Sequence, residues 1–377
     1  MKCQRNPGFR LLRSTQALIF TIVPTDPILL AGIGGASAPE LAAAVSNAGG
    51  LGILGAAALS PDELSEWISR TRKLTDKSFG VDTLLPARVP SGGSKSAMRA
   101  ELPQAHIDFA KSFKERHNIP NPDPKKYPSR GGFALSKDFQ KKQIEVILDE
   151  NAPVYVAGLG DPSFILEDAH ARGMKVMTIA GAVKHAKRFQ EGGVDIIMAQ
   201  CTDGGGHSGR IGTMVLVPQV VDVVSPTPVV VAGGTADGRG LVAALALGAV
   251  GIWSAIPFLP TPESGIDHFQ KEAIVDAASE DAIISRCMTG KPVRQLKNKW
   301  VEEFEAPGLD ALPMPFQGFI SLPVLEAARQ AKMKDIYPGI AGQSVGLLKS
   351  IRPAKEVFEG IVTQAQHILS ERSPQTG

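Results

Sequence analysis

The sequence predicts an α/β fold, a (β/α)8 TIM barrel in which short strands alternate with helices. Apolar runs recur along the chain between capped or amphipathic stretches, and within each run apolar residues follow one another without alternation. Strands buried on both faces of a parallel sheet have this pattern. Eight such runs favour a closed barrel over an open sheet. They lie at 27–32, 51–54, 78–85, 153–157, 175–179, 194–200, 228–232 and 250–254.

The helices expected between these strands carry start and stop signals. Ser60 stands at an N-cap, with Pro61 at the first helical position and Glu63 completing a capping box. The expected helices lie at 39–48, 60–74, 162–172, 182–191 and 238–247, and glycines follow the first of them.

The chain is expected to have three parts. Residues 26–262 form the barrel, an N-terminal arm of residues 1–25 precedes it, and residues 263–377 form a helical C-terminal cover. Residues 86–140 are polar and rich in proline, glycine, lysine and arginine, with one helix-like piece around 104–117. We expect them to be an insertion after strand 3 that serves as a lid or as a partner surface.

Composition and charge exclude several classes of function. Forty basic and 38 acidic residues leave a formal net charge of +2, which gives no electrostatic footprint for nucleic acid. The three cysteines, Cys3, Cys201 and Cys287, are too few for a disulfide framework and lack the spacing of a metal site. A reducing, cytoplasmic location is therefore expected.

Two segments have features of targeting or membrane sequences. Residues 1–25 carry four basic residues and no acidic one. A frayed arm is favoured there, and organellar targeting or a membrane-surface segment stays open. Residues 240–262 carry no charge, but glycines and prolines interrupt them. A buried helix ending at Gly248, followed by a buried strand, explains them better than a membrane span.

The loop after the sixth strand is the first candidate site. Gly204, Gly205 and Gly206 let the backbone approach a ligand closely, and His207 follows them. This loop lies on the face of the barrel where active sites are found, so His207 is expected to transfer a proton or to stabilise charge. The alternative is a surface histidine in a mobile loop.

Two further interpretations of this loop are weaker. A metal site from Cys201, Asp203 and His207 has neither a second histidine nor a spacing motif. A nucleophilic Cys201 has only His207 nearby to lower its pKa. The remaining histidines lie in helix-like stretches and are expected to be solvated: His106, His117, His170, His185, His268 and His367.

Glycine-rich turns follow the seventh and eighth strands. Gly233 and Gly234 precede a helix whose first backbone N–H groups are expected to face an anion, and Ser254, Ala255 and Ile256 follow the next strand. Such turns form the usual phosphate cradle of a barrel. The Asp-Gly-Arg sequence after the first turn is expected to cap the helix rather than to bind a second anion.

In order along the chain, residues 39–52, 205–209 and 228–251 resemble the nitronate monooxygenase (2-nitropropane dioxygenase) family of FMN-dependent barrels. The likeness spans roughly residues 25–350. It implies a (β/α)8 barrel, FMN as the cofactor, and His207 as the catalytic residue. The resemblance implies that FMN is bound by Ala31, Gly32, Ile33, Asp82, Gln200, Gly205, Gly206, Gly233, Gly234, Ser254, Ala255 and Ile256.

Within that set, Gly233 and Gly234 match the phosphate turn of the family and Gln200 matches its flavin-facing glutamine. Asp82 falls where many members place an asparagine near the flavin. Residues 31–33 differ from the usual Ala-Pro-Met. Residues 255–256 are Ala-Ile in place of the usual Gly-Thr, which keeps backbone N–H groups but loses a threonine hydroxyl.

Other stretches are similar to a divergent branch of the family. Residues 79–86, the insertion and residues 289–294 are similar to dehydrogenases or reductases that act on CoA thioesters. The loop pattern is also similar to flavin-dependent enoyl-thioester reductases.

The leading hypothesis is an FMN-dependent nitronate monooxygenase that oxidises alkyl nitronates with O2, using His207 to hold the nitro oxygens. One alternative is a flavin-dependent dehydrogenase or enoyl reductase acting on a CoA or carrier-protein thioester, and another is a non-catalytic flavin- or anion-binding protein. A small-molecule substrate is expected, without nucleic acid or a membrane span, and a homodimer is left open. In the thioester alternative, basic residues of the insertion would meet phosphates, although a solvated flap is favoured: Arg88, Lys95, Arg99, Lys125, Lys126 and Arg130.

Overall fold

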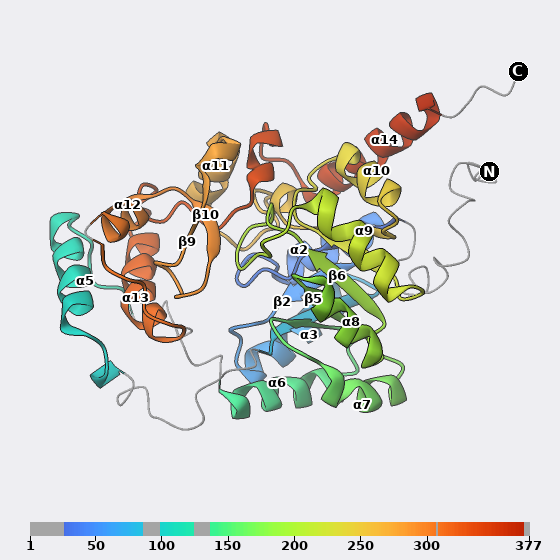
Figure 1. Ribbon diagram of the computed structural model, residues 1–377, viewed down its shortest axis with the longest axis horizontal. Coiled ribbons are helices and arrows are strands. Elements are labelled where there is room, and N and C mark those ends of the chain that lie inside the picture. The colour runs from blue at the N-terminus through green and yellow to red at the C-terminus, as the bar shows by residue number, and fades with distance from the viewer. Residues whose placement is uncertain (1–25, 86–98, 124–135, 307, 373–377) are drawn as a thin grey trace, which may run out of the picture.

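The centre of the molecule is a parallel β-barrel, seen in a computed structural model that describes residues 26–85, 99–123, 136–306 and 308–372 (Figure 1). Neighbouring strands of the sheet are parallel and follow the chain order. The predicted TIM barrel is confirmed. Its strands are β1 (Ile28–Leu30), β2 (Gly52–Gly55), β3 (Phe79–Leu84), β4 (Val154–Gly158), β5 (Lys175–Ala180), β6 (Ile196–Gln200), β7 (Val229–Ala232) and β8 (Gly251–Ser254).

Leu51 completes the ring between β1 and β2. It forms a parallel bridge with Leu29, accepts the N–H of Leu30 at 2.9 Å, and donates its own N–H to the carbonyl oxygen of Ile28 at 3.1 Å. The strands therefore form a closed barrel. Side chains of successive residues point alternately into the barrel interior and toward the surrounding helices. In β4, for example, Val156 packs in the barrel interior while Tyr155 packs against the surrounding helices.

Helices surround the barrel on its outer side (Figure 1). The predicted capping box at the start of α3 is confirmed, because Ser60 Oγ accepts the N–H of Glu63 and the Glu63 carboxylate accepts the N–H of Ser60. The helices between strands are α2 (Pro39–Ala48), α3 (Pro61–Leu74), α6 (Lys137–Asp149), α7 (Leu166–Ala171), α8 (Val183–Glu191), α9 (Thr213–Val224) and α10 (Gly238–Ala246).

Two of these helices were not predicted from the sequence. Helix α6 begins inside the stretch assigned to the insertion, with Ser136 as its N-cap, and buries Ile144, Ile147 and Leu148 against the barrel. Helix α9 is rich in valine and contains Pro218, a composition that disfavours a helix in isolation. Packing of its buried face on the barrel overrides that preference.

A second apolar cluster lies beside the barrel (Figure 1). Trp300 is fully buried at its centre, with the rings of Phe109 and Phe113 at centroid distances of 5.4 and 5.1 Å. The helix-like piece of the insertion thus packs on residues from the C-terminal part of the chain. We call this body the side lobe; it consists of α5 (Gln104–Arg116), β9 (Ala282–Ser285), β10 (Val293–Leu296), α12 (Lys299–Glu305) and α13 (Phe316–Gln330).

The side lobe corrects two expectations. Strands β9 and β10 form an antiparallel hairpin in a region expected to contain only helices. The expectation that the helical histidines are solvated is wrong for His106, which is 7% exposed. Its Nε2 lies 2.9 Å from the carbonyl oxygen of Asp310, and its ring packs near Phe304. A helix-like sequence context therefore does not decide whether a histidine is exposed.

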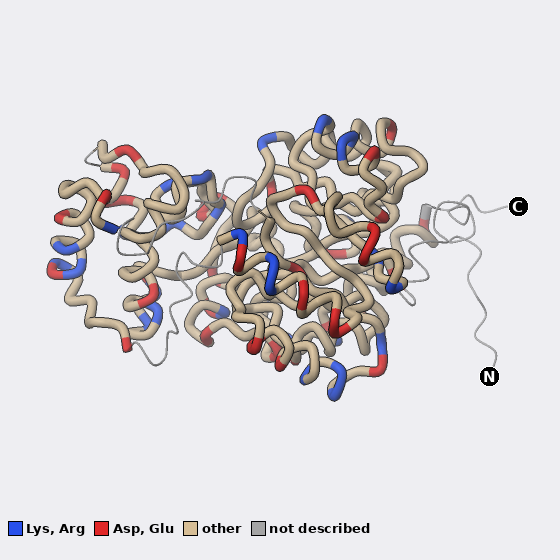
Figure 2. Tube along the Cα trace, turned by 90° about the horizontal axis from the view of Figure 1, so that it is seen from below, with Lys and Arg blue, Asp and Glu red and all other residues tan. Residues whose placement is uncertain are grey.

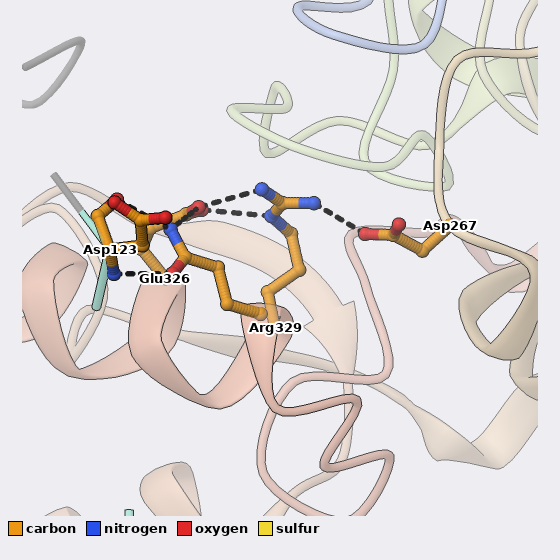
Figure 3. A network of polar contacts seen from close by, with 5 residues as sticks. Asp123, Asp267, Glu326 and Arg329 are labelled. Carbon is orange, nitrogen blue, oxygen red and sulfur yellow. Dashed lines mark hydrogen bonds and ion pairs between the residues drawn. The ribbon is translucent and has the colours of Figure 1, made fainter. Parts of the chain in front are cut away.

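Polar contacts connect the side lobe to the segment that precedes α11 (His268–Asp276). Arg329 on α13 donates hydrogen bonds to both carboxylate oxygens of Glu326 and, in the opposite direction, to Asp267 (Figure 3). Nearby, the N–H of Asp123 in the insertion donates to Gln330 at 2.7 Å. Three stretches distant in sequence are thereby connected.

The last helix, α14 (Ala354–Arg372), packs on the barrel and not on the side lobe. Gln364 accepts the N–H of Gly238 at the start of α10 at 2.7 Å. Acidic and basic residues are interspersed along the described part of the chain (Figure 2). Residues 240–262 contain α10 and β8, and none of the described helices has the length and apolarity needed to cross a bilayer.

Candidate active site

A cavity of about 260 Å³ opens at the C-terminal ends of the barrel strands, where the active sites of such barrels lie. Ser254 is the one predicted site residue that does not line it; this serine is buried and donates a hydrogen bond to the carbonyl oxygen of Thr235 at 3.2 Å. The other predicted residues are brought together in its wall: Ala31, Gly32, Ile33, Asp82, Gln200, Gly205, Gly206, His207, Gly233, Gly234, Ala255 and Ile256.

Close packing between loops explains several of the glycines in this wall. A Cβ on Gly32 would lie 2.3 Å from the Cβ of Asp82, and one on Gly205 would lie 2.8 Å from the backbone of Ala341. Gly233 has a φ of +111°, which other residues rarely adopt. The glycines therefore let neighbouring loops approach one another around the cavity.

His207 is held by the side lobe. Its Nε2 lies 2.9 Å from the hydroxyl of Thr289, in the turn between β9 and β10. Immediately before it, Gly206 forms an antiparallel bridge with Arg294 of β10. The buried guanidinium of Arg294 also donates to the carbonyl oxygen of Thr202, at the start of the same loop. A loop that its glycines would leave flexible is thus fixed from outside the barrel.

The imidazole of His207 is neutral at neutral pH. Burial, with a smaller contribution from the positive charge of Lys291, lowers the pKa of His207 to about 4. A neutral imidazole donates one N–H and accepts one hydrogen bond, so it can hold an anion or take up a proton.

Asp82 is the second titratable side chain in the cavity wall, and it is 6% exposed. Burial raises the pKa of this carboxyl well above its usual value. Its Oδ1 atom has no hydrogen-bond partner among the described residues. This shift favours the neutral carboxyl, and in that form it can donate a hydrogen bond to a bound molecule.

The side chains of Cys201 and Asp203 form hydrogen bonds away from the cavity. The thiol of Cys201 is buried and donates to the carbonyl oxygen of Ala199, and burial raises its pKa to about 11, so it is a poor nucleophile. The carboxylate of Asp203 accepts hydrogen bonds from the hydroxyl and the N–H of Thr213. These contacts speak against a metal site in this loop, and the described residues contain no group of three or more candidate metal ligands.

The start of α10 differs from expectation in one respect. Asp237 caps the helix as predicted and accepts the N–H groups of Arg239 and Gly240 at 3.0 and 3.2 Å. The N–H of Gly238 is already bonded to Gln364. The prediction that the first amides of this helix face an anion is therefore wrong, since side chains already occupy them.

Sequence reasoning missed part of the cavity wall. Leu159 follows β4 with a φ of +58°, and Trp253 lies in β8; the rule that active-site residues follow barrel strands could have found the first of them. Ile340 and Ser344 come from the C-terminal region, which offers no comparable signal. The missed lining residues are Gly34, Gly55, Ala57, Leu84, Gly158, Leu159, Ile179, Ala232, Thr235, Trp253, Leu259, Ile340 and Ser344.

Comparison with known families supports the resemblance to nitronate monooxygenases that the sequence shows. The sequence model described as nitronate monooxygenase matches residues 15–364. A Mycobacterium tuberculosis protein named as a monooxygenase is 39% identical over 339 residues, which cover 86% of this chain and 90% of that protein. A Staphylococcus aureus protein named as a nitronate monooxygenase is 32% identical over 355 residues, covering 91% and 95%.

Solved structures also match along nearly the whole chain. A nitroalkane oxidase from Streptomyces ansochromogenes has a TM-score of 0.80 at 27% identity, covering 95% of this chain and all of that one. FabK from Thermotoga maritima has a TM-score of 0.73 at 29% identity, covering 94% and 97%.

Proposed function

The chain belongs to the nitronate monooxygenase family of flavin-dependent oxidoreductases, and we propose that it uses FMN to oxidise alkyl nitronates with O2. The observation that carries the proposal is the position of His207, a neutral imidazole in the wall of a cavity at the C-terminal end of the barrel. A nitronate is a delocalised anion that can reduce a flavin directly, so the protein needs only to bind and orient it.

The residues of the cavity suit a flavin nucleotide. Two of its polar atoms, Asp82 Oδ1 and Thr235 Oγ1, are buried without a hydrogen-bond partner among the described residues. Apolar side chains such as Trp253 and Ile179 line the same space and would cover a planar ring. When bound, FMN would accept electrons from the substrate and pass them to O2. We propose that Asp82 and Gln200 face the ring, and that Gly233 and Gly234 approach the phosphate.

In this proposal, His207 positions the nitronate. Thr289 engages Nε2 and leaves Nδ1 as the ring nitrogen for a nitro oxygen. Because the imidazole is neutral, it binds the anion by an N–H hydrogen bond and stays unprotonated near pH 7. The raised pKa of Asp82 favours the same substrate, since an ionised carboxylate in this small cavity would repel an anion.

In the thioester alternative, basic residues of the insertion would meet the phosphates of the substrate. Arg88, Lys95, Lys125, Lys126 and Arg130 lie outside the described residues. Arg99 is described, and its guanidinium lies 5.9 Å from the centre of the Phe319 ring of the side lobe. These observations do not favour an acidic thioester over a nitronate, so the alternative is retained as the contrary outcome of the experiment.

Anaerobic reduction tests the proposal. Purified protein should show a flavin absorption band that an alkyl nitronate bleaches without NADH and that air restores. His207→Ala should keep the flavin and lose this reduction, whereas His268→Ala, at an exposed histidine of α11, should behave like the parent protein. A bound flavin that ignores nitronates but is reduced by NADH and reoxidised by an enoyl thioester would establish the alternative.

A further inference from the structure

We propose that the hydroxyl of Thr235 binds the phosphate of the flavin nucleotide and thereby makes the site selective for FMN over riboflavin. This inference rests on the proposed function. It assigns to the turn after β7 a side-chain donor that the sequence of the turn after β8 lacks, because Ala255 and Ile256 have no hydroxyl.

The proposal rests on the burial of the Thr235 side chain and on the missing hydrogen-bond partner of its hydroxyl. The residue lines the cavity, is 7% exposed, and follows Gly233 and Gly234 directly. Its Oγ1 is buried and has no hydrogen-bond partner among the described residues. Buried hydroxyls are nearly always paired in folded proteins, so an unpaired one in a cavity wall points to a ligand atom.

The surroundings of Thr235 hold that hydroxyl in place. The carbonyl oxygen of Thr235 accepts a hydrogen bond from Ser254 Oγ at 3.2 Å. On its other side the residue packs on α10, where a Cβ on Gly240 would lie only 3.0 Å from the Thr235 Cα. Gly233 and Gly234 both have positive φ values, of 111° and 78°, so the turn before Thr235 is tight. A fixed hydroxyl loses little entropy when it binds a ligand.

Phosphate is the part of FMN that needs this donor. The first amides of α10 are taken by Asp237 and Gln364, and the cavity wall contains no lysine or arginine among its described residues. Within the turns at the ends of β7 and β8, the donors that remain for an anion are backbone N–H groups and the hydroxyl of Thr235. Within these turns, residues 232–235 and 255–256, Thr235 has the one polar side chain that lines the cavity.

Reconstitution with two flavins tests the inference. Apoprotein prepared by removing the flavin is titrated with FMN and with riboflavin, which has the same ring and no phosphate, and binding is followed by flavin fluorescence. We expect Thr235→Val to weaken FMN binding by about tenfold to a hundredfold, the range of a hydrogen bond to a charged group, and to leave riboflavin binding unchanged. Thr235→Ser, which keeps the hydroxyl, should retain most of the FMN affinity.

Two results would contradict the role of Thr235. If Thr235→Val binds FMN as tightly as the parent protein, or weakens FMN and riboflavin by the same factor, then the hydroxyl does not bind the phosphate. Thermal unfolding of each apoprotein separates these results from misfolding, because loss of an unpaired buried hydroxyl should not lower Tm. If the parent protein binds neither flavin, the proposed function fails as well, which distinguishes that outcome from failure of the Thr235 assignment alone.

Discussion

Gly206 and Arg294 join the barrel to the side lobe through paired backbone hydrogen bonds, with N···O distances of 3.0 and 2.8 Å. The first residue lies directly before His207 and the second lies in β10. The loop that carries the proposed catalytic residue therefore pairs, at one residue, with the hairpin of β9 and β10. The geometry of the site therefore depends on both the barrel and the side lobe.

Substitution of Arg294 should weaken the contact between the His207 loop and the side lobe. Its guanidinium donates to the carbonyl oxygens of Thr202 and Ala282, and Arg294→Met leaves both without that partner. We expect a loss of roughly 2–4 kcal/mol in the free energy of unfolding measured with urea. Lys297→Met, an exposed change beside the same hairpin, should alter it by less than about 0.5 kcal/mol. Equal effects of the two changes would contradict a structural role for the Arg294 contacts.

The charge of Lys291 should affect the protonation of His207. Burial is the larger cause of the pKa of about 4, and Lys291 acts in the same direction. Lys291→Gln should therefore raise the pKa of His207 toward 6.5 without reaching it, while Lys291→Arg, which keeps the charge, should leave it unchanged. NMR titration of the His207 ring in the apoprotein measures this. In the parent protein the signal should stay constant from pH 8 down to about pH 5.5.

Asp82 should make the stability of the apoprotein depend on pH. Burial raises its folded-state pKa above 3.8, so over the interval between these two values the folded protein holds a proton that the unfolded chain has released. Stability contributed by this group is full below pH 3.8 and is lost as the pH rises through the folded-state pKa. Asp82→Asn should therefore be more stable than the parent protein at pH 8, and the difference should shrink toward pH 4.

The control for Asp82 is Asp222→Asn, at an exposed position of α9. Urea unfolding at pH 4, 6 and 8 compares the three proteins. If the advantage of Asp82→Asn is the same at all three values, the Asp82 carboxyl is ionised throughout in the folded protein.

Close packing at Gly32 should make its replacement costly. A methyl group there would lie 2.3 Å from the Cβ of Asp82, so Gly32→Ala should lower the free energy of unfolding by roughly 1–3 kcal/mol and reduce flavin binding. Gly212→Ala is the matched control, because Gly212 does not line the cavity and a Cβ there meets nothing within 4 Å. Thermal unfolding and flavin content of both variants check the prediction, and similar values for the two would refute it.

The sequence predicted the barrel and part of the cavity wall because both depend on local patterns. Each strand is a mainly apolar run, and the predicted site residues other than Asp82, which lies within β3, are at the end of a strand or in the loop that follows it. Helices α6 and α9 were not predicted, for different reasons. Helix α6 lies at the end of an irregular polar stretch, whereas α9 has the valine content of a strand.

Contacts between distant segments could not be predicted in this way. The hydroxyl of Thr289 meets His207 across a separation of 82 residues, and no local pattern connects them. The same holds for Ile340 in the cavity wall. The unpaired state of Thr235 Oγ1 also depends on the packing of α10 around it, which composition does not specify. The roles of the site residues remain predictions.

The position of Gly205 against Ala341 and Gly342 has a consequence for synthesis of the protein. All eight barrel strands have been translated by residue 254, yet the glycine loop receives these neighbours nearly ninety residues later. A nascent chain can therefore build its sheet on the ribosome while the histidine loop still lacks its outer support. The binding site is completed late, and a chain interrupted after β8 would lack part of its wall.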